Sequence, residues 1–292
     1  MKKQGYEVKL IDRWEPPEGD DLRPLVAMPN IPKPLHLVNP RNLLGRKTWD
    51  MMRKGAYHMA NDTCEICGYK PENMHQRHGH EVYEIDYKEG TATFKRVFCI
   101  CSLCHLGGIH TGRAITLFKK GNPLYPKEFL LEGAEHAFKI IYEYNQDHPD
   151  ADLRAYSTYL EYLKQPELRD KMVELIDKYQ IKFYEENTKN MADWGDWKLI
   201  IGNKEYKTPY KTYAEWEEAM EKQSGNDTAR ILQKNIEEKF SGGVYDELDK
   251  IISGTTLSDV VNGTDKGNEA VRLAMEKAQE DMQKTIDKAQ DV

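Results

Sequence analysis

Twelve consecutive residues, 99–110 (CICSLCHLGGIH), hold three cysteines and two histidines. Cys101 and Cys104 form one CxxC motif in this stretch, and Cys64 and Cys67 form another, separated from it by 33 residues. Each CxxC turn directs two thiolates at one ion, and two such turns complete the tetrahedron that Zn²⁺ prefers. The spacing therefore predicts a structural Zn²⁺ bound by these four cysteines.

The fifth cysteine, Cys99, lies two residues before Cys101, on the same side of a predicted strand. We interpret it as a buried free thiol, and the alternative is a substitute ligand of the metal ion. No signal peptide is expected, because the N-terminal lysines precede no apolar segment, and no apolar run approaches the roughly 18 residues of a membrane span. We therefore expect a cytosolic protein without a membrane partner, in which clustered cysteines are metal ligands rather than disulfides.

The charge of the chain is unevenly distributed. The whole chain of 292 residues has a formal net charge of -7, yet residues 41–120 contain 13 Lys and Arg against 8 Asp and Glu. Six of the nine histidines lie in the same region. A weakly basic region in an acidic chain is compatible with a nucleic-acid site.

The elements that position the cysteines can be predicted from apolar spacing. A helix over residues 48–60, with Trp49, Met52, Ala56 and Met59 on one face, leads into the first CxxC motif. Two strands, 81–87 and 91–100, flank a turn at 88–90 and lead into the second motif. Both cysteine pairs are thus expected at the ends of regular elements.

The rest of the chain predicts an α+β fold in four segments. Seven prolines between residues 14 and 40 indicate an extended Pro-rich arm over residues 1–40, because proline lacks a backbone donor and is excluded from helix interiors. Residues 41–120 form the zinc-binding domain. Residues 121–222 form a mostly helical extension, with helices over 151–164 and 167–179 and a small β-hairpin at 197–207. Residues 223–292 form a polar helical tail.

Three stretches resemble a known family: WDMMRKGAYHMANDTCEICG, GHEVYEIDY and VFCICSLCHLGGIHTGR. Their order and intervals are similar to the zinc-stapled branch of the HNH (ββα-metal) endonucleases, over residues 36–118. The long chain with a helical extension resembles members encoded by bacteriophages and prophages of Gram-positive hosts. The resemblance implies a zinc-stapled, HNH-like ββα-metal finger in residues 41–120.

The resemblance also implies a hydrolytic site. His80 matches the general base, and His105 and His110 match the ligands of a second divalent ion (Mg²⁺, Mn²⁺, Ni²⁺ or Zn²⁺) that stabilises the scissile phosphate. Four cations are candidates for binding backbone phosphates: Arg77, Lys95, Arg96 and Arg113.

The chain departs from the family pattern at three places. Gly79 precedes the base where the family has Asp or His, although His78 lies two residues back on the same strand face. The middle Asn has no counterpart, and Arg96 is roughly at its place. His105 and His110 are five residues apart, which on a regular α-helix leaves them about 140° from each other. Either His105 alone binds the ion, or Gly107 and Gly108 break the helix and re-aim His110.

We predict a metal-dependent HNH-type endonuclease in the cytoplasm of a bacterial host cell, acting on DNA rather than RNA. The alternative is a catalytically degenerate HNH-like scaffold that binds a protein partner through its acidic C-terminal region, as a phage-encoded inhibitor of a host defence complex or a packaging accessory. A third interpretation is a zinc finger that binds nucleic acid without cutting it. The sequence leaves open whether the protein forms a homo-oligomer.

Overall fold

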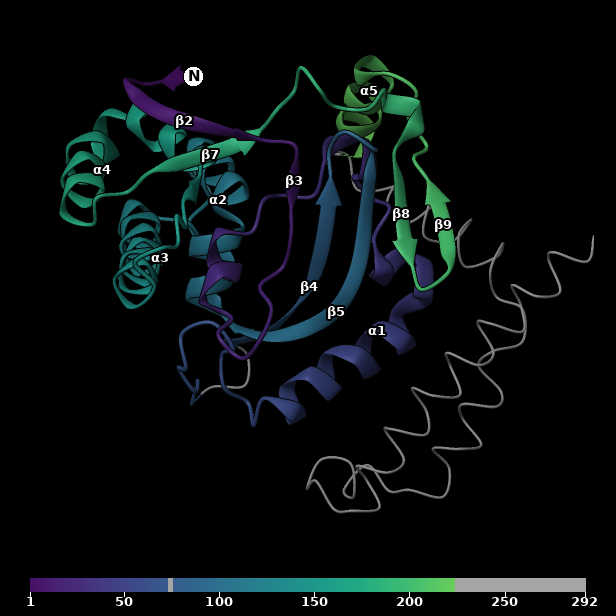
Figure 1. Cartoon of the computed structure of the whole chain (residues 1–292), viewed down its shortest axis with the longest axis horizontal. Coiled ribbons are helices and arrows are strands. Elements are labelled where there is room, and N and C mark those ends of the chain that lie inside the picture. Colours follow the sequence, from purple (N-terminus) through teal and green to yellow (C-terminus); the bar gives the residue numbers. More distant parts are fainter. Residues whose placement is uncertain (73–75, 224–292) are drawn as a thin grey trace, which may run out of the picture.

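The computed structural model describes residues 1–72 and 76–223, which form a mixed α+β fold with two sheets. In the larger sheet the strand order is β3-β4-β5-β8-β9, with bounds Arg13–Trp14, Arg77–Asp86, Thr91–Cys101, Lys198–Ile201 and Lys204–Lys207. In the smaller sheet the order is β1-β2-β7-β6, with bounds Lys2–Lys3, Tyr6–Ile11, Phe183–Glu186 and Ala155–Tyr156. Figure 1 shows the long β4–β5 pair at the centre, with the β8–β9 hairpin on one side and the helices that accompany β2 and β7 on the other.

The antiparallel β4–β5 hairpin confirms the two strands predicted before the second CxxC motif. Its register pairs His80 with Phe98 and Gly79 with Cys99. Successive side chains of a strand point to opposite faces of the sheet, so His78 and His80 share one face and Gly79 lies on the other. The turn between the strands uses Gly90 at a φ of +67°, a conformation that costs glycine little.

Helix α1 (Pro40–Met59) covers the helix predicted over residues 48–60 except its last residue, and it begins about eight residues, or just over two turns, earlier. Asn39 caps it, because the backbone N–H of Asn42 donates to Asn39 Oδ1 at 3.0 Å, and the helix bends at Gly45, where φ is +78°. Trp49 and Ala56 are buried against Val97 of β5. Met59 is 82% exposed, so the predicted apolar face ends before it.

Helices α2 (Thr111–Lys119), α3 (Lys127–Asp147) and α4 (Pro166–Lys178) lie beside the smaller sheet (Figure 1). The predicted helix over 167–179 corresponds to α4. Residues 151–164 do not form the predicted helix. Residues 151–154 have no regular structure, strand β6 follows, and the 3₁₀ segment η5 (Ser157–Lys164) completes the stretch. The predicted hairpin at 197–207 is present as β8 and β9, and α5 (Tyr213–Gln223) follows it.

Residues 1–40 differ from the predicted extended arm. They supply β1, β2 and β3 and two short 3₁₀ segments, η1 (Arg23–Ala27) and η2 (Lys33–Leu35). Strand β2 pairs in parallel with β7, from the other end of the described chain, and Leu25, Val26 and Leu35 are buried. The prolines prevent long helices, but the apolar residues between them still lose water by packing against the core.

One hydrophobic cluster joins three of the predicted segments. Leu25 from the N-terminal segment, Phe98 and Cys104 from the zinc-binding region and Phe138 from α3 belong to the same buried cluster. The five-stranded sheet also joins β5 to β8 of the extension. The division of the chain at residues 40 and 120 therefore does not coincide with separate cores.

The predicted tail, residues 223–292, lies outside the described residues apart from Gln223. Within the described residues, no helix is both long and apolar enough to cross a membrane.

Candidate metal centres

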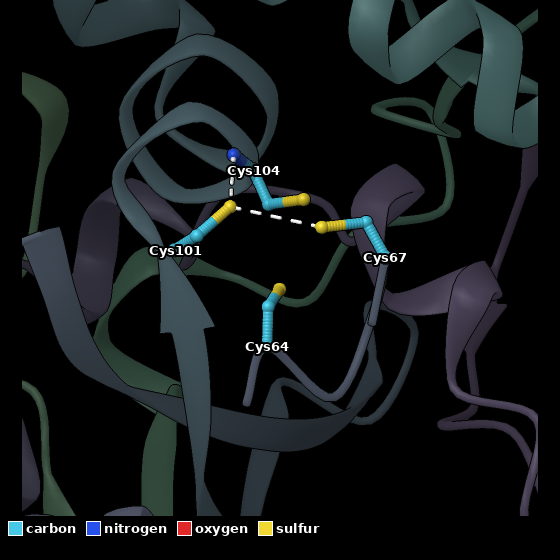
Figure 2. Close-up of side chains that lie close together, drawn as sticks. All are labelled: Cys64, Cys67, Cys101 and Cys104. Carbon is cyan, nitrogen blue, oxygen red and sulfur yellow. Dashed lines mark hydrogen bonds between the residues drawn. The ribbon is translucent and has the colours of Figure 1, made fainter. Parts of the chain in front are cut away.

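Four cysteine thiols converge between the first CxxC turn and the end of β5. The sulfur atoms of Cys64, Cys67, Cys101 and Cys104 all lie within 4.8 Å of one another. Figure 2 shows them pointing into a common space, Cys64 and Cys67 from one loop and Cys101 and Cys104 from the strand end and the turn that follows. The four cysteines predicted as a set are thus close enough to bind a metal ion.

The separation of the sulfur atoms suits a tetrahedral ion. Cys67 Sγ lies 3.8 Å from Cys101 Sγ. Four thiolates about 2.3 Å from a tetrahedral Zn²⁺ are separated from one another by about 3.8 Å. Three neighbouring thiols, that of Cys104 first, hold the pKa of Cys101 far below its usual range. The contact with Cys101 raises the pKa of Cys67 and of Cys104, so without an ion Cys101 holds the negative charge and these two neighbours keep their protons, which a bound metal ion would displace.

The first CxxC turn is fixed to β5 by Glu65. Its carboxylate accepts a hydrogen bond from the backbone N–H of Cys99 at 2.6 Å and forms an ion pair with Arg96 at 2.9 Å. The backbone N–H of Glu65 in turn donates to the carbonyl of Cys99 at 2.9 Å. Cys99 itself is 1% exposed and outside the four-cysteine cluster, as its interpretation as a buried free thiol requires.

Helix α3 contributes a contact that sequence reasoning did not find. His136 Nε2 lies 3.2 Å from Cys104 Sγ. Hydrogen bonds to ligand atoms orient them and tune their basicity, so His136 is placed to fix the Cys104 sulfur. The signal in the sequence was weak, since His136 is 32 residues from Cys104 and appears as one polar residue on an amphipathic helix.

A second cluster lies directly beside the first. The nearest ring nitrogens of His80, His105 and His110 lie within 4.8 Å of one another, so these three can also hold an ion. His80 comes from β4 and is 6% exposed, whereas His105 and His110 are half-buried. His105 follows Cys104 in the chain, so one peptide bond joins the two clusters.

His105 and His110 come together because the chain between them is a π-helix. The segment η4 (Leu103–Ile109) is wound with i→i+5 hydrogen bonds, and the backbone N–H of His110 donates to the carbonyl of His105 at 2.8 Å. Residues five apart therefore lie one above the other, and their ring centroids are 4.6 Å apart. The separation of about 140° expected for a regular α-helix does not apply, and Gly107 and Gly108 widen the turn without ending it.

The two glycines of η4 lie where α3 crosses it. A Cβ on Gly107 would come within 2.5 Å of Gly133 Cα, and one on Gly108 would come within 3.0 Å of Val26 Cγ2. The buried hydroxyl of Tyr159 donates to the carbonyls of Gly107 and Gly108, at 3.3 and 3.4 Å. Close packing and this hydroxyl together stabilise the π-turn.

Hydrogen bonding leaves free nitrogen atoms in the histidine cluster. His80 Nδ1 donates to the carbonyl of Glu81 at 2.7 Å, which leaves Nε2 as the unprotonated nitrogen of the neutral ring. His105 Nδ1 is buried and has no hydrogen-bond partner among the described residues. An unsatisfied buried nitrogen is costly unless a ligand completes it, and an ion would do so.

Burial keeps these rings neutral. It lowers the pKa of His80, lowers that of His105 well below its usual value, and lowers that of His110 to about 3. The neighbouring histidines lower the pKa of His105 and His110 further. Neutral imidazoles have the lone pairs that a metal ion or a proton requires.

Packing against α1 explains why position 79 is a glycine, where the HNH pattern has Asp or His. A Cβ on Gly79 would lie 2.7 Å from Arg53 Cβ, because α1 crosses β4 at this point on the face opposite to His80. A ligand at position 79 would point away from the histidine cluster. His78 is on the cluster face, and its ring stacks on that of His105 with centroids 4.7 Å apart.

Three of the four predicted phosphate-binding cations have carboxylate partners. Arg77 pairs with Asp62 and stacks on Tyr57, Lys95 pairs with Glu84 at 2.6 Å, and Arg96 pairs with Glu65. Arg113, on α2, is exposed, and its charge is one cause of the low pKa of His110, after burial and His80. Arg113 is therefore the predicted cation that is best placed for a ligand of the histidine cluster.

A further cation near the cluster was not predicted. Arg41, near the start of α1, is exposed, stacks over Trp49 at 4.8 Å, and contributes to the low pKa of all three histidines, although burial contributes most. This role of Arg41 could not be predicted from the sequence, because Pro40, directly before it, was taken as the end of an extended arm.

Comparisons of the chain with protein-family models, with curated proteins and with solved structures found no match.

Proposed function

We propose that the chain is a metal-dependent endonuclease of the HNH type, with Zn²⁺ in the four-cysteine site and a hydrolytic site at His80, His105 and His110. The convergence of these three histidines on one point carries the proposal. The buried, unpartnered Nδ1 of His105 fits a ligand role, and the free Nε2 of His80 fits a general base.

The two clusters suit different tasks. Four thiolates close a tetrahedral site and leave no position for a substrate, which is typical of structural zinc. A hydrolytic site needs open positions for water and phosphate, and three histidines leave such positions on an ion; His105 and His110 are also only half-buried. A divalent ion held by His105 and His110 would act as a Lewis acid on the scissile phosphate.

In the proposed reaction, His80 Nε2 takes a proton from a water molecule. The water oxygen forms a bond to phosphorus, the P–O bond to the leaving group breaks, and the leaving alkoxide takes a proton from a solvent water molecule. The carbonyl of Glu81 holds the His80 ring in the required tautomer and stabilises the imidazolium that results. In this proposal Arg113 and Arg41, whose charges act on His110, would hold the flanking phosphates.

A catalytically inactive scaffold is the second candidate. It is favoured by the carboxylate partners of Arg77, Lys95 and Arg96, which reduce the positive charge available to a nucleic acid. In this case the two metal centres would only stabilise the fold, and a protein partner would bind elsewhere, with the acidic region after residue 223 as its candidate surface.

Incubation of the purified protein with supercoiled plasmid distinguishes the two. The endonuclease proposal predicts nicked and linear DNA with at least one of Mg²⁺, Mn²⁺, Ni²⁺ and Zn²⁺, and none without an added ion. Intact plasmid with all four ions, from protein that has kept its bound zinc, would support the scaffold instead.

A further inference from the structure

Three aromatic side chains meet where helix α5 contacts the rest of the protein. The ring centroids of Tyr213 and Trp216, both on α5, are 5.3 Å apart. The ring of Trp194, in the 3₁₀ segment η6 (Trp194–Asp196), lies 5.7 Å from that of Tyr213, at 89° to it, and 6.2 Å from that of Trp216. The three rings thus form the walls of a small aromatic cage.

The cage contains a cation from the N-terminal part of the chain. Lys33 Nζ, on η2, lies 4.9 Å from the ring centroid of Trp216 and 5.1 Å from that of Tyr213. A cation at such distances is attracted by the negative face of the ring. Lys33 is exposed and Tyr213 is 45% exposed, so water competes for the ammonium group and the attraction is weak. The cage by itself therefore holds α5 only loosely on η2.

A hydrogen bond that depends on protonation accompanies the cage. Trp216 Nε1 donates to His36 Nδ1 at 3.1 Å, and the two rings meet edge to face with centroids 5.5 Å apart. An indole N–H can only donate, so His36 Nδ1 must be unprotonated. The His36 ring also donates to the backbone carbonyl of Ile31, which fixes the same neutral tautomer. A proton on Nδ1 would place two N–H donors against each other.

The surroundings of His36 favour the neutral ring. Burial lowers the pKa of His36 most, the charge of Lys33 lowers it further, and the hydrogen bond to Ile31 raises it. Glu215 is bonded to a backbone N–H, and Glu217 to a tyrosine hydroxyl of the same helix. The titratable groups on the elements around the ring are Lys33 of η2, Lys211 before α5, Tyr213, Glu215, Glu217 and Glu218 of α5, and Asp193 and Asp196 at η6.

We propose that the contact of α5 with η2 is a pH-sensitive switch, in which α5 stays docked while the His36 ring is neutral and is released when the ring takes a proton. Protonation removes the hydrogen bond from Trp216 and places a second positive charge near Lys33. The contacts of the exposed cage are too weak to compensate. The switch involves neither metal cluster, and it acts on the helix that precedes residues 224–292 in the sequence.

The direction of the pH dependence follows from the pKa of His36. The docked ring has a pKa below the ordinary value of 6.5, whereas the ring is free of burial once α5 has left. The proton therefore binds more tightly to the released state. Docking is strongest well above pH 6.5 and weakens as the pH falls below that value.

The test labels the full chain with 5-fluorotryptophan and follows its five tryptophans by ¹⁹F NMR between about pH 7.5 and pH 5. Single Trp→Phe variants assign the resonances. Trp49 and Trp197 are buried away from α5 and report on the integrity of the fold. His36→Asn retains an acceptor near the position of Nδ1 but has no ionisable group. His148→Asn removes an exposed histidine at the end of α3 and is the control.

In the parent protein and in His148→Asn, the Trp216 and Trp194 resonances should move together toward the position of an exposed fluorotryptophan, with a midpoint below pH 6.5, while those of Trp49 and Trp197 stay. In His36→Asn they should not move. Lys33→Gln should raise the midpoint by roughly half a pH unit, because it removes both a neighbouring charge and a cage contact.

Three results would overturn the proposal. The first is a Trp216 resonance that does not move in the parent, or that moves only together with those of Trp49 and Trp197. The second is the same movement in His36→Asn as in the parent. The third is a midpoint in Lys33→Gln that is unchanged or lower.

Discussion

The backbone N–H of His110 donates to the carbonyl of His105 at 2.8 Å, across a π-turn that brings the two imidazoles to 4.6 Å between ring centroids. This hydrogen bond spans five residues, whereas an α-helix would close over four. It allows two histidines at an otherwise unsuitable spacing to face His80. The geometry of the candidate site therefore depends on the residues that hold η4 in its wide turn.

The first prediction concerns Tyr159, whose hydroxyl donates to the carbonyls of Gly107 and Gly108. Tyr159→Phe leaves both buried acceptors without this donor, which should cost about 1–3 kcal/mol in the free energy of unfolding. It should also weaken binding of Ni²⁺ or Co²⁺ at the histidine cluster, measured by titration of the zinc-loaded protein. Tyr162→Phe is the control, because it removes a buried hydroxyl that bonds Thr111 outside η4. It should lower stability without changing metal affinity, and an equal loss of affinity would show that the effect is not specific to the π-turn.

The second prediction concerns Gly107. Gly107→Ala would force a Cβ to within 2.5 Å of Gly133 Cα, which is backbone and cannot rotate away. The crossing of η4 and α3 must then open, and urea unfolding should show a loss of about 1–3 kcal/mol or more. Gly55→Ala, inside α1 with no atom within 4 Å of the new Cβ, should instead be neutral or stabilising by up to about 1 kcal/mol. Unchanged stability in Gly107→Ala would contradict the close contact of η4 with α3 at this position.

The extent to which the sequence predicted the candidate site is clearest at these glycines. The four cysteines could be grouped because CxxC spacing is local and chemically specific, and the structure confirms that they lie together. The histidine pair could not be resolved, since the π-turn depends on Gly133 and Tyr159, which are 26 and 52 residues away from Gly107. The sequence left two alternatives open, a regular helix in which His105 binds alone and a helix broken at Gly107 and Gly108, and the π-turn that this distant packing stabilises is neither of them.

The fold was predicted well where the two strands that pair are close to each other in the sequence. The β4–β5 and β8–β9 hairpins are pairings across short turns, and both were predicted. The pairing of β2 with β7 joins Val8 to Phe183, and no local pattern shows such a contact. The Pro-rich segment was misjudged for a related reason, since its prolines hide the apolar residues, such as Leu25 and Leu35, that fill the core.

The third prediction concerns His136, whose Nε2 contacts Cys104 Sγ at 3.2 Å. His136→Leu should lower the affinity of the four-cysteine site for zinc by about 10- to 100-fold, because loss of a hydrogen bond to a ligand atom weakens the ligand. Competition with a chromophoric chelator measures this. His148→Leu, just beyond the end of the same helix and stacked on Tyr144, should leave the affinity unchanged. Equal affinities for both variants and the parent would remove His136 from the site.

The fourth prediction concerns which cysteines bind the metal. Cys67→Ser should purify without the tightly bound ion and with a large loss of stability, because structural zinc in small modules contributes on the order of 10 kcal/mol. Cys99 lies two residues before the second CxxC motif but is outside the cluster, so Cys99→Ser should retain one equivalent of zinc. Elemental analysis of both proteins decides the point. Zinc in Cys67→Ser, or its absence from Cys99→Ser that is still folded, would contradict the assignment of the ligands.

The assignment of His80 as general base is tested most directly by comparing the rate of duplex cleavage and the metal content of His80→Ala with those of the parent protein and of His148→Ala. The account predicts that His80→Ala keeps its structural zinc and its fold but cleaves about 10²–10⁴-fold more slowly, since loss of a general base has this effect on rate, while His148→Ala cleaves as the parent does. Cleavage by His80→Ala at the parent rate, under an ion that supports the parent, would contradict the account.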